Sequence, residues 1–300
     1  MRLIFALVLG LVATVTPAVA QDREFIGAGR LFNNDVFGDG YDRWRTGSYV
    51  YSNLRARGPY TGGESFGDLL EYRLRTEIVA PERGTTAPGD RPYAGMLSLG
   101  VHTHFNAAGT QMSLGGDIVA VGPSTRMSQF QEYYHDTFSL PDPPHVDQQL
   151  ADAIWFNANV SASKQFQVND TLSVRPFVQA QAGVEDLMRA GADVWVGAIG
   201  QQDLKLRDVV TGQLYRGSQS GDQGMAYVFG IDVAAVSDSR LLPADQGYIV
   251  SPTRTRARAG VHWQLGQVTS LFGGATYLSE EFTGQRSGQV VGSLKLNFNF

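Results

Sequence analysis

Apolar and polar residues alternate one by one along several segments of the chain, which is the period of a β-strand rather than of a helix. The last segment shows the pattern most clearly. Val290, Leu294 and Leu296 fall on one face of an extended chain, and Ser293 and Lys295 fall on the other. This alternation predicts a strand with one apolar face and one polar face.

Two further segments carry charges on the polar face. Residues 69–80 place charges of both signs on one face, and residues 252–266 place arginines there. A soluble core would not accept these groups, because burying unpaired charge is costly. A wet, charged lumen under an apolar exterior fits both segments. The charged positions are Glu71, Arg73, Arg75, Glu77, Arg254, Arg256 and Arg258.

Twelve segments of this kind follow one another between clusters of Gly and Pro, and bacterial transmembrane barrels have an even number of strands. The sequence therefore predicts an all-β fold, a twelve-stranded antiparallel transmembrane β-barrel. A periplasmic sandwich with one solvated sheet face would also alternate and is the alternative. Phe300 resembles the carboxy-terminal signal by which outer-membrane barrels are inserted. The predicted strands span 24–33, 45–57, 69–80, 94–106, 110–122, 152–167, 171–186, 190–205, 224–238, 252–266, 268–280 and 288–300.

The first twenty residues indicate export. Arg2 supplies a positive region, residues 3–15 form an apolar run, and a small-residue cleavage pattern ends at Ala20. We therefore expect a signal peptide over 1–20, cleavage near Ala20, and one outer-membrane barrel domain over 21–300. A membrane anchor that stays attached is the weaker alternative, because the apolar run is short.

Composition removes several function classes. The chain has 24 Lys and Arg against 29 Asp and Glu, so it has no overall basic field to hold a nucleic acid. It has no Cys, which excludes disulfides, thiolate zinc sites and Cys nucleophiles. Any chemistry must use oxygen and imidazole groups.

Residues 123–150 fit neither a strand nor a simple turn. A Ser/Thr cap signal and a short helical pattern precede a Pro-rich stretch, which predicts a short helical insertion near residues 124–140. Gln131 and His135 stand at i and i+4, so a helix would place both on one face. We expect that face to look toward the barrel mouth. A long structured insertion on a barrel is usually functional.

Four motifs in the first half of the chain resemble the lipid A 3'-O-deacylases. They are Asn34-Asp35, Asp42-Arg43-Trp44-Arg45-Thr46-Gly47, Asp90-Arg91-Pro92-Tyr93-Ala94-Gly95, and Val121-Gly122-Pro123 followed by Gln131 and His135. The resemblance implies a twelve-stranded outer-membrane barrel that removes an ester-linked acyloxyacyl group from lipid A. It also implies dependence on calcium and a His base. The implied partners are lipid A in the outer leaflet and other outer-membrane lipids, and we expect a monomer.

The resemblance assigns roles to individual residues. The imidazole of His135 is the natural base near neutral pH, and Asn and Asp supply the hard oxygen ligands that calcium prefers. Asn-Asp after a strand is also ordinary turn chemistry, and the segment at Arg91 would also fit a rigid turn with a surface ion pair. By resemblance, the catalytic residues are His135, Gln131 and Thr46, the substrate-binding residues are Arg91 and Asn34, and the calcium ligands are Asp35 and Asn34.

Two other function classes stay open at this point. A non-catalytic barrel of the same family, structural or weakly pore-forming, would keep the motifs for architecture alone. Asn33, Met96 and His145-Val146 depart from the family pattern, which bears on this alternative. A phospholipase of the outer-membrane type needs a His two residues before a Ser nucleophile, and the sequence contains no His-x-Ser.

Overall fold

The computed structural model describes residues 23–82, 90–143, 148–218, 223–266 and 269–298. Within them, strands account for most of the ordered backbone, and the helices are short. The elements are β1 (Glu24–Asn34), η1 (Asp35–Phe37), β2 (Trp44–Ala56), β3 (Leu69–Ala80), β4 (Ala94–Ala107), β5 (Thr110–Val121), η2 (Pro123–Thr125), α2 (Met127–Phe138), β6 (Ala153–Ser163), β7 (Phe166–Asn169), β8 (Leu172–Ala182), β9 (Glu185–Val196), β10 (Lys205–Arg207), β11 (Leu214–Arg216), β12 (Gly224–Ser239), η3 (Ala244–Gln246), β13 (Thr253–Gln264), β14 (Thr269–Leu278) and β15 (Gln289–Phe298).

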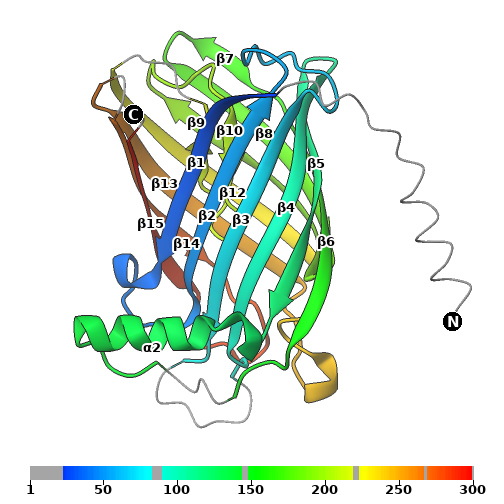
Figure 1. Cartoon of the computed structure of the whole chain (residues 1–300), viewed down its shortest axis with the longest axis vertical. Coiled ribbons are helices and arrows are strands. Elements are labelled where there is room, and N and C mark those ends of the chain that lie inside the picture. The colour runs from blue at the N-terminus through cyan, green and yellow to red at the C-terminus, as the bar shows by residue number, and fades with distance from the viewer. Residues whose placement is uncertain (1–22, 83–89, 144–147, 219–222, 267–268, 299–300) are drawn as a thin grey trace, which may run out of the picture.

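The long strands form a closed antiparallel barrel (Figure 1). Chain neighbours pair with each other, β1 pairs with β15, and β9 pairs with β12. The consecutive wall strands β6 and β8 also pair, from Ala158 opposite Ala182 to Ser163 opposite Phe177, which completes the ring. The short strand β7 continues along β8 beyond that point. This confirms the predicted twelve-stranded barrel, with β7 as an extension of the sixth strand.

The two faces of the barrel wall follow the predicted alternation. Leu99, Phe156 and Ile231 are 63%, 65% and 59% exposed, and they lie on the outer face. Glu71 and Arg258 are 0% and 4% exposed, and they point into the lumen. The apolar exterior is what a bilayer requires, because lipid tails offer no partner to a polar side chain.

One end of the barrel carries α2 and most of the longer connections. Transmembrane barrels have short periplasmic turns and longer extracellular loops, so the α2 end is the extracellular end. Figure 1 shows α2 lying across the outside of the lower ends of the front strands, with β1 beginning at the opposite, periplasmic end. None of the helices in the described part of the chain is long and apolar enough to cross a membrane.

The structure corrects two predicted strands. The predicted turn near residues 187–189 lies instead at residues 183–184, so the strands are β8 and β9 rather than 171–186 and 190–205. Gly183, with a φ of 137°, makes that turn, and Asp186 accepts a hydrogen bond from its N–H. Strand β9 ends at Val196 because Gly197, with a φ of 143°, turns the chain inward. Leu-Met-Arg has no turn former, whereas glycine adopts these angles without strain.

The segment after Gly197 fills the periplasmic half of the lumen, which corrects the expectation of a simply wet interior. Strands β10 and β11 pair as a hairpin inside the barrel, here called the plug hairpin (205–216). Leu206 and Tyr215 of the hairpin pack against Leu54 and Phe272 of the wall. Apolar packing of this kind removes water from the inner wall.

Buried charges in the lumen are arranged in opposite-sign clusters. The guanidinium of Arg45 contacts three carboxylates, at 2.6 Å from Glu77, 2.8 Å from Glu185 and 2.9 Å from Glu281. An uncompensated buried charge would be strongly destabilising, so each partner needs the others. The lumen is therefore held together by polar networks at the extracellular half and by the hairpin at the other.

The predicted signal peptide (1–20) and Phe300 both lie outside the described residues. The one-domain expectation over 21–300 and the cleavage near Ala20 stay predictions for the same reason.

The outward direction of Leu99 on β4 gives a test of the wall. Leu99→Lys would place a charge on the lipid face and should cost about 2–4 kcal/mol of folding free energy near the bilayer midplane. Leu99→Ala serves as the control, because it shortens the side chain without adding charge. Urea unfolding in lipid vesicles measures both variants. Equal stability of the Lys and Ala variants would contradict the assigned face.

Candidate active site

A cavity of about 740 Å³ lies between α2 and the outside of the barrel wall, near the extracellular ends of β1 to β3. We call it the outer groove. Its walls are largely apolar, with a polar patch where η1 and the start of β2 meet α2. Its lining residues are Phe32, Asn34, Val36, Gly40, Tyr41, Asp42, Thr46, Gly47, Ser48, Tyr49, Thr76, Ile78, Glu82, Met127, Phe130, Gln131, Tyr134, His135, Leu140 and Pro141.

The loop from η1 to β2 is fastened to the far end of the sequence. Gly38 passes so close to β15 that a Cβ there would lie 2.0 Å from the carbonyl oxygen of Val290. The N–H of Asp39 donates to the same carbonyl at 3.0 Å. Gln289 donates through Nε2 to the carbonyl of Arg43 at 2.6 Å. Closure of β1 on β15 thus fixes the loop that carries the polar patch.

Asn34 and Asp35 end the first strand and turn the chain. Oδ1 of Asn34 accepts the N–H of Val36 at 2.8 Å, which starts the 3-10 turn η1. Asp35 is 0% exposed, and its carboxylate accepts the N–H of Arg43 at 2.8 Å. Thr46 Oγ1 lies 3.1 Å from Asp35 Oδ1. No Lys or Arg side chain among the described residues forms an ion pair with Asp35.

Thr46 connects two carboxylates. Its Oγ1 lies 2.7 Å from Asp42 Oδ1 as well as 3.1 Å from Asp35 Oδ1. A hydroxyl has one proton, so it donates to only one of the two oxygens at a time. Asp42 itself stands in an uncommon backbone conformation, with a φ of 49°. The result is a cluster of converging oxygen atoms at the polar end of the groove.

The acidity of Asp35 follows from this setting. Burial is the largest cause and raises the pKa of its carboxyl to about 8. The backbone N–H of Arg43 opposes the rise, while the neighbouring carboxylates of Asp42 and Asp39 add to it. Asp35 lies in η1, beyond the end of strand β1. A positive charge close to Asp35 would instead lower the pKa of its carboxyl.

Helix α2 brings Gln131 and His135 to the same place. Both are buried, at 5% and 6% exposure, so the predicted common face is confirmed. That face lies against the outside of the barrel wall and not over its mouth, which corrects the expected direction. Gln131 accepts a hydrogen bond from the hydroxyl of Tyr93 at 2.9 Å and donates to Asp42 Oδ1 at 3.1 Å. Gln131 therefore positions Asp42.

The two ring nitrogens of His135 have different surroundings. Nδ1 lies 2.5 Å from the carbonyl oxygen of Pro141, which can only accept, so Nδ1 carries the proton. In neutral imidazole the lone pair is then on Nε2. Nε2 lies 3.7 Å from Asp42 Oδ2, at the polar end of the outer groove. The arrangement leaves Nε2 able to accept a proton from a group bound there.

The sequence matches one known protein family over nearly its whole length. The sequence model of the family described as outer membrane protein LpxR matches residues 3–300. The chain belongs to the LpxR family. The family comprises the lipid A 3'-O-deacylases of the outer membrane, which are ester hydrolases.

The solved structure of one LpxR protein shows the same fold. LpxR from Salmonella typhimurium is 17% identical and superposes with a TM-score of 0.74, covering 91% of this chain and 100% of that one. The β domain of the Bordetella autotransporter BrkA is 10% identical with a TM-score of 0.46, covering 91% and 100% of the two chains. The KdgM porin is 7% identical with a TM-score of 0.42, covering 91% and 98%. No curated protein sequence matches the chain.

The structure of this LpxR-family chain brings together Asn34, Asp35, Thr46, Gln131 and His135 around one groove.

Arg91 lies elsewhere. Its side chain is 0% exposed inside the lumen, where it forms an ion pair with Glu281. It does not line the outer groove. Asn33 is also buried and donates to Ser48 and Asp208, while Met96 packs with buried apolar residues around Val119. These two departures from the family pattern therefore face away from the groove, and the third, His145-Val146, lies outside the described residues.

Sequence reasoning left three contributors out of the site. Asp42 was only part of a motif, although a carboxylate beside a predicted calcium ligand is a usable signal. Tyr93 and Gln289 act through contacts between distant parts of the chain, from the loop before β4 and from β15. Tyr93, like Asp42, stood only as part of a motif, and nothing in the local sequence marks Gln289.

The contact of Tyr93 with Gln131 can be tested directly. Tyr93→Phe removes the hydroxyl donor and leaves a buried amide oxygen unpaired, which should cost about 0.5–1.5 kcal/mol of stability and lower turnover on lipid A. Tyr133→Phe on the exposed face of α2 is the matched control, because Tyr133 is 69% exposed. Urea midpoints and initial rates measure both. Identical behaviour of the two variants would show that Gln131 needs no support from Tyr93.

Proposed function

We propose that this chain releases the 3'-acyloxyacyl group of lipid A by calcium-dependent ester hydrolysis in the outer groove. The observation that carries the proposal is the meeting of His135 Nε2 with the oxygen cluster of Asp35, Asp42 and Thr46 in an apolar groove on the outer wall. The groove opens at the level of the outer leaflet, where the acyl chains of lipid A lie.

His135 is the proposed base. With Nδ1–H held by the carbonyl of Pro141, its Nε2 accepts the proton of a water that attacks the ester carbonyl. Asp42 Oδ2, 3.7 Å away, stabilises the imidazolium that forms. Gln131 and Tyr93 keep Asp42 in place and act as positioning residues. As the ester C–O bond breaks, the imidazolium gives this proton to the leaving sugar oxygen, which departs as a hydroxyl.

The oxygen cluster fits a calcium ion. No group of three or more His, Asp or Glu side chains in the described residues is spaced to hold a metal by itself. Calcium, however, also accepts hydroxyl, amide, main-chain and water oxygens. Asp35 and Asp42 both contact the hydroxyl of Thr46, and Asn34 precedes Asp35 and lines the groove, so several hard oxygen atoms converge here. When bound, calcium would polarise the ester carbonyl and stabilise the oxyanion.

The shape of the groove suits an acyl chain. Phe32, Ile78, Met127 and Phe130 line its apolar part. An acyl chain entering there stays among apolar groups and gains the usual stabilisation of buried apolar surface. The lining residues all belong to one chain, so we infer that a monomer is sufficient for activity.

A weakly pore-forming barrel receives no support from the described residues. Leu206, Leu214 and Tyr215 of the plug hairpin are packed against the inner wall. A structural role alone would not need an imidazole held in a single tautomer at the end of a groove.

Replacing the base gives a sharp test. His135→Ala should lower turnover about 10²–10⁴-fold, which is the usual contribution of a general base. Asp136→Ala is the control on the exposed face of the same helix, and it should keep the parent rate. Lipid A mass spectrometry measures loss of the acyloxyacyl unit. A folded His135→Ala barrel that deacylates at the parent rate would move the base elsewhere.

Calcium binding can be measured separately from deacylation. Asp35→Asn keeps the size of the side chain but removes its charge, so calcium affinity should fall about tenfold or more. Isothermal titration calorimetry with calcium measures the affinity, and the heat-resistant folded band on a gel reports the fold. Excess chelator should abolish turnover of the parent chain. Full activity in chelator would remove calcium from the mechanism.

A further inference from the structure

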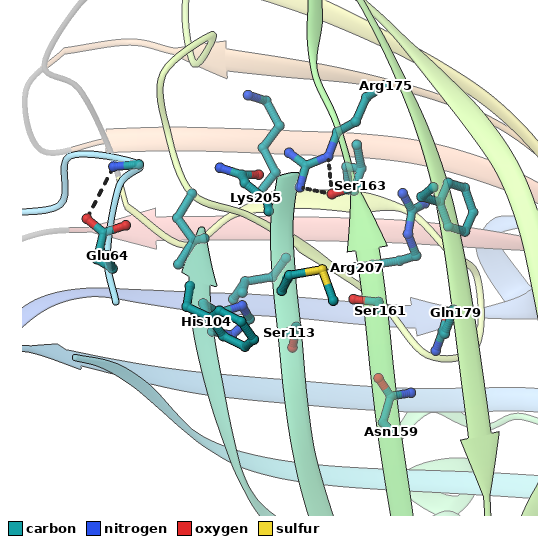
Figure 2. Close-up of a pocket in the computed structure, with 18 of the residues that line it drawn as sticks. Glu64, His104, Ser113, Asn159, Ser161, Ser163, Arg175, Gln179, Lys205 and Arg207 are labelled. Carbon is teal, nitrogen blue, oxygen red and sulfur yellow. Dashed lines mark hydrogen bonds between the residues drawn. The ribbon is translucent and has the colours of Figure 1, made fainter. Parts of the chain in front are cut away.

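A second cavity, of about 70 Å³, lies inside the barrel toward its periplasmic end. It is enclosed by the inner faces of β4, β5, β6 and β8 and by the plug hairpin (Figure 2). A water needs roughly 10–15 Å³ of such space, so the cavity holds a few waters or one small ion. The wall separates it from the bilayer and from the outer groove. We call it the lumen cavity.

Two cations at the lumen cavity have no carboxylate in contact. Arg175, on β8, is 9% exposed and donates only to the hydroxyl of Ser163, at 2.8 and 3.1 Å. Lys205, on β10, is 5% exposed, and its Nζ donates to neutral oxygens of Gln165 and Gln201. Neither forms an ion pair in the described part of the chain, although buried charge is normally paired.

The acidic residues nearby are already engaged. Asp193 pairs with Arg207 and Arg258, and Asp203 pairs with Arg216. Glu64, which also lines the cavity, accepts the turn N–H groups of residues 61 and 62 at 2.6 and 3.2 Å.

The charge balance of the interior points the same way. Across the described residues, 12 buried Lys and Arg side chains stand against 10 buried Asp and Glu side chains. The whole chain has the opposite balance, 24 against 29. The interior is thus short of negative charge.

The remaining lining of the cavity offers polar groups without partners. Ser161, Asn159 and Gln179 project into the cavity in Figure 2, and Ser113 faces them from β5. Their side chains form no hydrogen bond with any other described residue. Hydroxyl and amide donors beside two cations are a recurrent setting for an oxyanion, because charge-assisted hydrogen bonds are the strong ones.

We propose that the lumen cavity binds one small inorganic oxyanion of the phosphate class. Arg175 and Lys205 supply its charge contacts, and Ser161, Asn159 and Gln179 complete the shell. Arg175 belongs to the wall and Lys205 to the plug hairpin, so the bound anion clamps the hairpin to β8. This site is independent of the outer groove and of the proposed deacylation. Its contents reach it from the periplasm.

The test is calorimetric titration of inorganic phosphate into the folded barrel in detergent, in calcium-free buffer at constant ionic strength. We expect one saturable site and a higher melting temperature with phosphate. Arg175→Gln and Lys205→Met should each weaken binding about tenfold or more, because each removes a charge-assisted contact. Lys164→Met, an exposed lysine at the same end of the barrel, should bind like the parent chain.

Two further measurements keep the result decisive. Glycerol 3-phosphate carries an organic substituent that inorganic phosphate lacks, so binding of this ester as tight as that of inorganic phosphate would overturn the proposal of a site for a small inorganic oxyanion. If the Arg175 variant fails to fold, the Lys205 variant and the parent titration still decide. Absence of saturable phosphate binding by the parent chain, or equal binding by the parent and Lys205→Met, would show that the cavity holds only water.

Discussion

Lipid provides no hydrogen-bond partner for the backbone, and this constraint organises the whole molecule. The strands must pair without a free edge, so consecutive strands pair all round the barrel and the first strand, β1, pairs with the last, β15. The pairing of β1 with β15 also builds the site. Gln289, at the start of β15, holds the loop between Asp35 and Arg43 that forms the polar end of the outer groove.

Because the barrel is closed, its wall has an inner and an outer face, and charged side chains lie on the inner face. Along β2, Arg45 points into the lumen and contacts Glu77, Glu185 and Glu281, while Thr46, the next residue, points outward to the groove. Successive side chains of a strand point to opposite faces, so the position of Arg45 in the lumen and the position of Thr46 in the groove depend on the same stretch of backbone. The ion network inside the barrel fixes the backbone that presents Thr46 outside. The inner charges support the site without touching it.

The sequence predicts those features that depend on local period. Alternation correctly places the wall residues on their faces, and the i, i+4 spacing correctly places Gln131 and His135 together. The sequence does not predict features that depend on contacts between distant segments of the chain. The plug hairpin reads as one more strand and a turn, because residues packed inside a barrel show no distinctive period. The inward direction of Arg91 is decided by Glu281, far along the chain.

The position of the groove outside the wall has a chemical consequence for an enzyme of a lipid. A site in the lumen would require acyl chains to leave the bilayer and cross a lining of buried charge. On the outer wall, the acyl chain can move from the leaflet to Phe32 and Phe130 without leaving an apolar phase. Only the ester has to reach the polar end, where His135 and the oxygen cluster lie. The lumen is then free to serve stability alone, which is why it can be filled.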